Sequence, residues 1–561
     1  MIFPKCSTIA ASFAIFFFLA LSYAEKAPYS FVKEATAAPA AEYYDYIVAG
    51  GGAAGCALAA TLSASAKVLL LERGGSPYEN SNVTDLAGFG MSLADTSPTS
   101  AAQQFTSADG VFNHRARVLG GGSAINAGFH VRASHEYVRG AGWYPALVRE
   151  SYEWVERKLV FRPRVVPWQA AVRGGLLEAG VRPDRGFTYE HLVGTKVGGT
   201  IVDENGYRHT AADLLEYADS AKTAVFLHAT VDKILFNTSY EKRPKAYGVM
   251  FKDSSGTHHS AYLNNGPKNE IILSAGALGS PQLLMLSGLG PAEHLKSHGI
   301  AVIMEQPMVG RGMADNPRNT IVVPTLKPMA KSLGQVVGVT DIGCYILTFS
   351  GFFEQPSTQT IIAQEYARLA NQTKNTRTET RLPEPSEFQV GHILEKVAGP
   401  FSSGHLELRS RDPNDNPKVT FNYFEDRRDL ERCVKGMKII KKVIESDPTT
   451  FLQYPFSSFQ ALIELNLAIP SNTRPRQAAR RGPAVSLEQF CKETVMTVWH
   501  YHGGCQVDRV VDRDYKVIGV DALRVVDGST FNYSPGTNPQ ATVMMLGRYM
   551  GHKLLQERSK L

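Results

Sequence analysis

The sequence has few cysteines and lacks the short motifs of several enzyme classes. Six cysteines occur among 561 residues, and none forms a C-x-x-C pair. This absence argues against structural zinc and thioredoxin-like chemistry. The chain also contains neither G-x-S-x-G nor H-E-x-x-H, which argues against the common hydrolases. No internal repeat is present.

An excess of charge of one sign is also missing. The net charge of +6 is small for this length, and the only dense basic run is Arg474–Arg481. We interpret that run as a solvated loop or helix face rather than a nucleic-acid or membrane surface. His258 and His259 adjoin, but no carboxylate or cysteine stands at ligand spacing, so we expect a solvated strand there. The sequence therefore predicts neither a nucleic-acid partner nor a metal site.

The one apolar run at a chain end lies at the N-terminus. Lys5, the apolar Ala10–Leu21 and Ser22-Tyr23-Ala24 have the order of a secretory signal peptide over residues 1–24, followed by a polar linker over 25–42. The run is too short to favour a stable membrane span. The chain ends in Ser559-Lys560-Leu561, a peroxisomal address. A signal peptide acts before the C-terminus exists, so we favour a secreted, extracellular or vacuolar protein, with the peroxisome as the alternative.

Acceptor triplets for N-glycosylation fit a secretory route. They begin at Asn82, Asn237 and Asn371. A fourth begins at Asn532, close to the proposed active site, and we expect it to be unused. The odd number of cysteines left after signal removal predicts at least one free thiol, and Cys56 is expected to serve packing.

A glycine turn between two apolar strands is the strongest feature that the chain does have. Tyr46–Ala49 leads into Gly50-Gly51-Gly52-Ala53-Ala54-Gly55, a helix-compatible stretch follows, and Val68–Leu71 ends on Glu72. This order is typical of a dinucleotide-binding unit. Gly50 allows the tight turn, Gly52 lets backbone approach the pyrophosphate, and Gly55 packs helix on strand. Glu72 can accept hydrogen bonds from a ribose. The pattern alone leaves nicotinamide and flavin both open.

Patterns farther along the chain predict the other elements. After a long surface connection over Gly74–Ser97, we expect strands near 224–235, 246–251 and 270–273, with a polar turn at 253–256 joining the later pair in a hairpin. Further strands are predicted over 321–324, 344–347 and 522–528. Amphipathic or apolar helices are predicted over 150–161, 430–444 and 541–555.

Three motifs resemble those of the glucose-methanol-choline oxidoreductases. Ala116–Asn126 is similar to the first signature of the family, and Gly276–Gly290 matches the second throughout. Val309–Pro317 resembles its Asp-His-Pro-type loop, with Asn316 in place of His. The resemblance runs from Tyr46 almost to the C-terminus and implies FAD as the cofactor.

The resemblance implies an α/β fold with two domains. A Rossmann-like FAD-binding domain is built from discontinuous segments, and an α+β substrate domain with an antiparallel sheet is inserted between them. We expect the first over residues 43–150, 220–318 and 491–561. The second is expected over residues 151–219 and 319–490.

The cofactor residues follow from the matched motifs. Some relatives attach flavin covalently through a His where this chain has Ile125, so we expect noncovalent FAD. Small residues at Gly120–Ser123 let the chain lie against the flavin, and Asn126 can hydrogen-bond its edge. The predicted contacts are Gly50, Gly52, Gly55, Glu72, Gly120, Gly121, Ser123, Asn126, Val231, Trp499, Asp527, Gly528, Asn538, Pro539 and Gln540.

The catalytic positions of the family match His500 and Asn538. A neutral imidazole can take the proton of an alcohol hydroxyl. An amide can hold the substrate oxygen without being a base. His502 and Tyr501 are possible substrate contacts, since an extended segment would turn His500 and His502 the same way. The alternative for His502 is a polar group beside the site, and Trp499 and Tyr501 are favoured as packing residues.

Within the family, the sequence is most similar to a plant branch of HOTHEAD-type proteins and flavin-containing mandelonitrile lyases. Trp499–Cys505 and Leu546–Tyr549 carry this likeness. The branch implies a disulfide between Cys433 and Cys491. Its lyases carry a His where this chain has Asn538, which weakens the lyase interpretation.

Three functions remain open at this level. The first is a secreted FAD-dependent enzyme that oxidises a primary or aromatic alcohol or a hydroxylated acyl chain, with O2 as a possible electron acceptor. The second is a hydroxynitrile lyase that cleaves a cyanohydrin without net redox chemistry. The third is a structural flavoprotein, which competent residues at both catalytic positions argue against.

Overall fold

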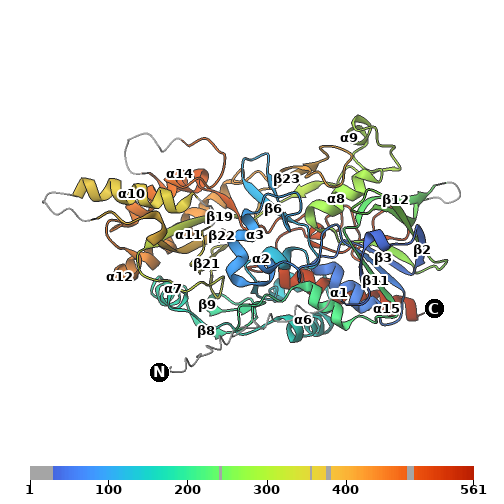
Figure 1. The fold of residues 1–561 in the computed structure, drawn as a ribbon, viewed down its shortest axis with the longest axis horizontal. Helices are drawn as coiled ribbons and strands as arrows, with labels where there is room; N and C mark the ends of the chain where they lie inside the picture. The colour runs from blue at the N-terminus through green and yellow to red at the C-terminus, as the bar shows by residue number, and fades with distance from the viewer. Residues whose placement is uncertain (1–28, 239–242, 354–356, 374–380, 477–484, 561) are drawn as a thin grey trace, which may run out of the picture.

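The structure is a computed structural model that describes residues 29–238, 243–353, 357–373, 381–476 and 485–560. The predicted signal peptide lies outside the described residues. The molecule is elongated, with parallel strands toward the end that holds the C-terminus and a second, helix-covered sheet toward the other (Figure 1).

A six-stranded parallel sheet forms the first region. Its order is β1 (Val32–Glu34), β11 (Thr223–Leu227), β4 (Val68–Leu71), β3 (Tyr46–Ala49), β15 (Glu270–Leu273) and β26 (Leu523–Val525). Neighbouring strands come from distant parts of the chain, and every pairing is parallel. The Rossmann-like domain assembled from discontinuous segments is therefore confirmed.

Side chains that alternate between the two faces of these strands pack the parallel sheet between two other layers, a second sheet on one face and helices on the other. Ile47 and Leu69 join the core shared with a neighbouring four-stranded sheet. Val48 and Leu70 point the other way, toward α1 (Ala53–Leu62), α6 (Pro145–Leu159) and α15 (Gln540–Ser559). Successive side chains of a strand point to opposite faces, so a sheet covered on both faces needs continuous apolar strands.

The neighbouring four-stranded sheet corrects two predictions. Its order is β12 (Thr230–Asn237), β13 (Lys245–Lys252), β14 (His258–Leu263) and β2 (Ala41–Tyr44). The turn at 253–256 joins β13 to β14, whereas residues 270–273 form β15 of the parallel sheet. The predicted linker over 25–42 contains β1 and the start of β2, because edge pairing needs backbone groups rather than an apolar sequence.

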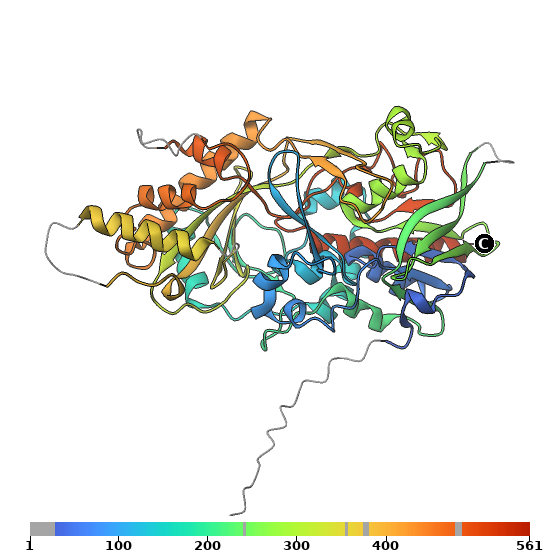
Figure 2. The same ribbon diagram turned by 45° about the horizontal axis from the view of Figure 1, so that its top comes forward.

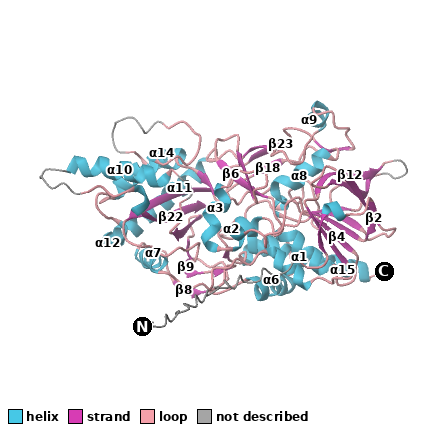
Figure 3. Ribbon diagram, in the orientation of Figure 1, coloured by secondary structure: helices cyan, strands magenta, loops and turns pink. Residues whose placement is uncertain are grey.

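A seven-stranded sheet forms the second region. Its order is β25 (Met496–Thr497), β19 (Pro317–Thr325), β22 (Gln389–Val397), β21 (Cys344–Ser350), β20 (Val336–Val339), β9 (Gly194–Val197) and β8 (Asp184–Phe187). Only β8 and β9 pair in parallel. The antiparallel substrate-side sheet is thus confirmed, and Figures 2 and 3 show it at the opposite end from the parallel strands.

Helices cover one face of this second sheet. They include α7 (Pro167–Glu178), α11 (Arg427–Ser446) and α13 (Phe459–Ala468). Leu430, Cys433, Met437 and Ile444 of α11 are all buried, which confirms the predicted amphipathic helix. The opposite face of the sheet is left for a cavity.

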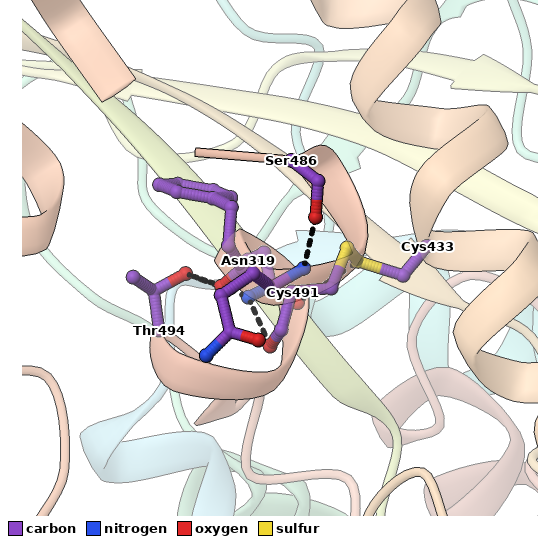
Figure 4. The surroundings of a disulfide bond; sticks show 7 residues. Asn319, Cys433, Ser486, Cys491 and Thr494 are labelled. Carbon is purple, nitrogen blue, oxygen red and sulfur yellow. Dashed lines mark hydrogen bonds between the residues drawn. A yellow bond between two sulfur atoms is a disulfide. The ribbon is translucent and has the colours of Figure 1, made fainter. Parts of the chain in front are cut away.

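A disulfide closes this helical layer (Figure 4). Cys433 of α11 bonds to Cys491 of α14 (Leu487–Glu493), 58 residues farther along the chain. The amide of Asn319 on β19 donates to the Cys491 carbonyl at 2.9 Å and to the Thr494 hydroxyl at 2.8 Å. The predicted pairing is confirmed. Cys56, Cys344 and Cys505 are buried free thiols.

Several local predictions differ from the structure. The segment 74–97 contains α2 (Ser81–Thr84) and α3 (Phe89–Ala94). The Asn80 side chain caps α2, and the Asp85 side chain caps the short 3-10 helix Leu86–Gly88 that leads into α3. His259 is buried beside Asp253, with 3.0 Å between Nε2 and Oδ2, while its neighbour His258 is exposed.

Further differences concern the basic run and the predicted domain limits. In the described part of the run, Arg474 is half-buried and donates from Nε to the Asp109 carbonyl at 2.9 Å. Most of α6, within the range predicted for the substrate domain, packs on α15. Nowhere in the described ranges is a helix both long enough and apolar enough to cross a bilayer.

Candidate active site

A cavity of about 350 Å³ lies between the two regions and takes its walls from both. The glycine turn before α1 lines one end. The open face of the seven-stranded sheet lines the other, through β21 and β22. A bound molecule would therefore reach from the parallel sheet to the antiparallel one.

The glycine turn has the close contacts that its motif predicts. Gly50 has φ +110°, and a Cβ there would lie 2.4 Å from the Ser274 carbonyl oxygen. A Cβ on Gly55 would lie 2.0 Å from the Gly50 oxygen, so only glycine lets α1 start this close to β3. Gly52 is the N-cap of α1 and lines the cavity. The first amides of the helix thus face a position suited to an anion.

Three other glycines leave space for a cofactor. Gly122, Gly276 and Gly528 line the cavity, and a Cβ on any of them would meet no atom within 4 Å. Larger side chains at these positions would fill the cavity. This cradle, together with the glycine turn, fits the dinucleotide that the sequence predicts.

Most predicted cofactor residues surround this cavity. Gly55 and Gly120 are exceptions, because they shape the turns behind it. Gly120 has φ +91°, and its Cβ would lie 2.7 Å from the Thr210 hydroxyl. The predicted residues on the wall are Gly50, Gly52, Glu72, Gly121, Ser123, Asn126, Val231, Trp499, Asp527, Gly528, Asn538, Pro539 and Gln540.

Polar cofactor residues are held in place by backbone amides and, in one case, by one another. Glu72 accepts hydrogen bonds from the Gly51 and Gly74 amides at 2.9 and 2.8 Å, and burial raises the pKa of its carboxyl group. Asn126 donates to the Gln540 side chain at 2.8 Å. Asp527 accepts from the Gly276 amide at 2.9 Å. These contacts fix the side chains before any ligand is added.

The two predicted catalytic residues meet on the cavity wall. His500 Nε2 lies 3.3 Å from Asn538 Nδ2, although 38 residues separate them in sequence. Burial is the main cause that lowers the pKa of His500 well below its ordinary value, and the charges of Lys396, His502 and Arg318 act in the same direction. The imidazole is therefore neutral at neutral pH and able to accept a proton.

Asp315 holds the segment that carries His500. One carboxylate oxygen accepts the His500 amide at 3.0 Å, and the other accepts the Thr497 hydroxyl at 2.6 Å and the Tyr423 hydroxyl. Burial raises the pKa of Asp315 to about 6. The Asp-Asn-Pro loop, recognised in the sequence only as a family likeness, thus anchors the proposed base.

His502 does not line the cavity, which favours the alternative that it is a polar group beside the site. His502 is buried, and its Nδ1 lies 3.0 Å from the His500 carbonyl oxygen. Tyr501 does line the cavity and donates to the His114 carbonyl at 2.8 Å.

Two buried cations near the site were missed from sequence. Arg318 on β19 lines the cavity, donates to the Thr497 carbonyl at 2.7 Å and lies 5.0 Å from the Trp499 ring centre. Lys396 on β22 donates to the Thr537 carbonyl, next to Asn538. Both residues lie outside the strands predicted from the sequence, in strand segments that also carry polar neighbours, so a hydrophobicity pattern gives no signal for them.

The wall beyond the catalytic pair is apolar. Side chains from the seven-stranded sheet and nearby loops form it: Leu333, Leu347, Phe349, Phe352 and Leu394. Phe89 of α3 packs edge-on against Phe352, with ring centres 5.8 Å apart. This half of the cavity suits the body of an apolar molecule rather than a charged one.

The fold and the site together define a flavoprotein with a dinucleotide cavity and a His–Asn pair. Two models of the family described as GMC oxidoreductase match residues 44–318 and 400–547. The chain belongs to the GMC oxidoreductase family, and FAD is the cofactor that this family indicates.

Related proteins support this membership. Protein HOTHEAD of Arabidopsis thaliana is 52% identical over 92% of this chain and 88% of its own. An (R)-mandelonitrile lyase-like protein of the same plant is 47% identical over 94% and 93%. Sinalpyl alcohol oxidase Nec3 of Nesocodon mauritianus is 41% identical over 92% and 90%. A formate oxidase crystal structure shares the fold, with TM-score 0.71 and 18% identity over 93% of this chain and 100% of its own.

Proposed function

We propose that this protein is a FAD-dependent enzyme that oxidises an alcohol carried on an apolar group. The observation that carries the proposal is the 3.3 Å approach of His500 Nε2 to Asn538 Nδ2 on the wall of the cofactor cavity. A neutral base and an amide at one point are what removal of a hydroxyl proton requires.

The residues divide the reaction between them. His500 accepts the hydroxyl proton at Nε2, and the Asn538 amide donates to the same substrate oxygen as negative charge develops there. Asp315 keeps His500 in place through the backbone amide. When bound, FAD supplies the acceptor for the hydride that leaves the carbinol carbon. The residues that would hold it are the glycine cradle, Glu72, Asn126 and Gln540.

The apolar wall supports a primary or aromatic alcohol or a hydroxylated acyl chain as the substrate. Leu347, Phe349 and Leu394 offer no charge to pair with an ionic substrate body. One relative carries the name of an alcohol oxidase, which agrees with this chemistry.

Anaerobic mixing with a panel of alcohols tests the proposal. The flavin absorbance near ~450 nm should fall on addition of a substrate, because hydride transfer reduces the flavin. Oxygen readmitted afterwards should restore the colour if O2 is the electron acceptor, as we propose. A flavin that stays oxidised with every alcohol would contradict the proposal of an alcohol oxidoreductase.

A hydroxynitrile lyase is the second candidate. His500 could equally take the hydroxyl proton of a cyanohydrin, and a relative at 47% identity is named mandelonitrile lyase-like. Asn538 stands where the resemblance places a second His in such lyases. Cyanide release from mandelonitrile, with the flavin oxidised throughout, would support this candidate instead.

Asn538→His compares the two candidates at one position. We expect alcohol oxidation to fall about 10-fold to 100-fold, since the amide donor is lost, and mandelonitrile cleavage to rise. Rates of both reactions should be measured on the same preparation. If neither changes, position 538 does not decide between them.

The remaining proposals concern attachment and location. We propose noncovalent FAD, because Ile125 offers no nucleophile, and a flavin that stays with acid-precipitated protein would contradict this. We also propose entry into the secretory route, with Asn82, Asn237 and Asn371 as glycan acceptors. All three asparagines are exposed. A shift in mass on glycosidase treatment of plant-expressed protein would support the route, whereas accumulation in peroxisomes would overturn it.

A further inference from the structure

Two lysines are completely buried in the seven-stranded sheet. Lys196 on β9 and Lys396 on β22 both have 0% exposed surface. Each Nζ donates to a main-chain carbonyl: Lys196 to Glu190, and Lys396 to Thr537. Neither forms an ion pair with any residue that the structure describes. Burial of an ammonium group destabilises a fold unless the group is well paired, so two such lysines need a structural or functional explanation.

Lys396 contacts the loop that ends in the catalytic amide. Its acceptor is the carbonyl of Thr537, the residue directly before Asn538. The loop has few other anchors there. The Thr537 hydroxyl and the Asn538 side-chain oxygen are buried and have no hydrogen-bond partner among the described residues. The bond from Lys396 is therefore a principal restraint on this part of the loop.

We propose that Lys396 is a positioning residue for the reaction, which holds the Thr537–Asn538 backbone so that the Asn538 amide stays against His500. This inference rests on the proposed function for its kinetic test. Asp315 and Lys396 would then act in parallel, one on each half of the catalytic pair. Asp315 fixes the His500 backbone at 3.0 Å, and Lys396 fixes the loop that carries Asn538.

Several charged and titratable groups surround Lys396. Burial lowers the pKa of Lys396 to about 7, and the charge of Asp315 opposes this shift. Arg318 and Tyr345 are its cross-strand partners, and Nζ lies 5.6 Å from the Tyr345 ring centre. The charge of Lys396 contributes to the lowered pKa of His191, His500 and His502. Removal of that charge should raise the pKa of His500 and move the acid limb of kcat/KM to higher pH.

Lys196→Met is a matched control for Lys396→Met. Both changes remove a fully buried ammonium group from the same sheet and a single bond to a carbonyl. Only Lys396 adjoins the catalytic pair. We expect kcat to fall about 100-fold in Lys396→Met with KM changed less than about threefold, since misplacement of a catalytic group by about 1 Å has such an effect. Lys196→Met should keep both constants within about threefold.

A second variant guards against a folding defect. Lys396→Gln keeps a hydrogen-bond donor without the charge, and its shorter side chain should lower kcat less than Lys396→Met does. Flavin content and unfolding temperature should be measured for every variant. In both Lys396 variants they should differ from the wild type by no more than they do in Lys196→Met. Equal loss of kcat in the Lys196 and Lys396 variants, or an unmoved acid limb in both Lys396 variants, would overturn the inference.

Crystal structures of Lys396→Met and Lys196→Met test the inference without any substrate. The His500 Nε2 to Asn538 Nδ2 distance, 3.3 Å here, should lengthen only in the Lys396 variant. An unchanged distance in Lys396→Met would refute the positioning role. Because this measurement needs no turnover, it stays decisive even if no alcohol reduces the wild-type flavin and the proposed function fails.

Discussion

The two sheets contribute to the cavity in opposite ways. The parallel sheet offers mainly backbone: Gly50 and Gly52 form the turn, and Gly276 leaves open space. The antiparallel sheet offers side chains, with Arg318 and Leu394 on the cavity wall and Lys396 buried behind it. A cofactor shared by a whole family can be bound through backbone shape, whereas the reaction depends on a few side chains whose positions must be fixed individually.

The largest loss of activity should come from His500→Ala, which changes the catalytic side chains and leaves the cofactor-binding backbone intact. Loss of the only proton acceptor at the pair should lower kcat/KM about 10³-fold to 10⁴-fold. Flavin content should be unchanged, because the glycine cradle is untouched. His258→Ala, an exposed histidine on β14, serves as the control in stopped-flow reduction of the flavin. Loss of flavin together with activity would mean that the two regions are not separable in this way.

Gly55→Ala is the opposite change, because it alters the cofactor-binding turn and leaves the catalytic side chains in place. In Gly55→Ala the new Cβ would lie 2.0 Å from the Gly50 oxygen, so the turn must open and FAD binding should weaken about 100-fold or more. Gly174→Ala, on the surface of α7 with nothing within 4 Å, should leave FAD affinity unchanged. Fluorescence titration of the apoprotein measures both. Normal affinity in Gly55→Ala would show that the turn tolerates a side chain.

The pH dependence of kcat/KM tests the catalytic side chains without a mutation. The pKa of His500 lies well below 6.5, mainly because of burial, so the base stays neutral and competent as the pH falls through 6.5. We expect kcat/KM to stay level there and to fall about tenfold per pH unit only below the lowered pKa. Initial rates across buffers at constant ionic strength measure it. An acid limb at or above pH 6.5 would contradict a desolvated base.

The smallest effect on chemistry should follow removal of the disulfide. Cys433 and Cys491 close a 58-residue loop in the layer behind the seven-stranded sheet. Cys433→Ser with Cys491→Ser should lower the free energy of unfolding by about 4 kcal/mol through the entropy of the open loop. Rates of flavin reduction at 25 °C should change less than about twofold. A large loss of rate with little loss of stability would place the bridge in the active-site machinery.

The sequence allowed more of the cofactor region to be predicted than of the substrate region. Glycine spacing and an acid at Glu72 report local backbone geometry, which short motifs encode. The position of His502, beside the site rather than on its wall, was left open because it depends on tertiary packing, which no residue type signals. Lys396 was missed because its role arises from contact with Thr537, 141 residues away. Such contacts come from tertiary packing and leave no local pattern.

The order of strands in the parallel sheet also governs when the protein can acquire its cofactor. Synthesis proceeds from the N-terminus, at about 5–20 residues per second. The edge strand β26 and the helix α15 belong to the last part of the chain, as do Gly528 and Asn538. A nascent chain therefore carries a glycine turn without the far wall of its cavity. We therefore expect flavin loading to follow synthesis of this last wall, and truncation before Gly528 should yield colourless protein.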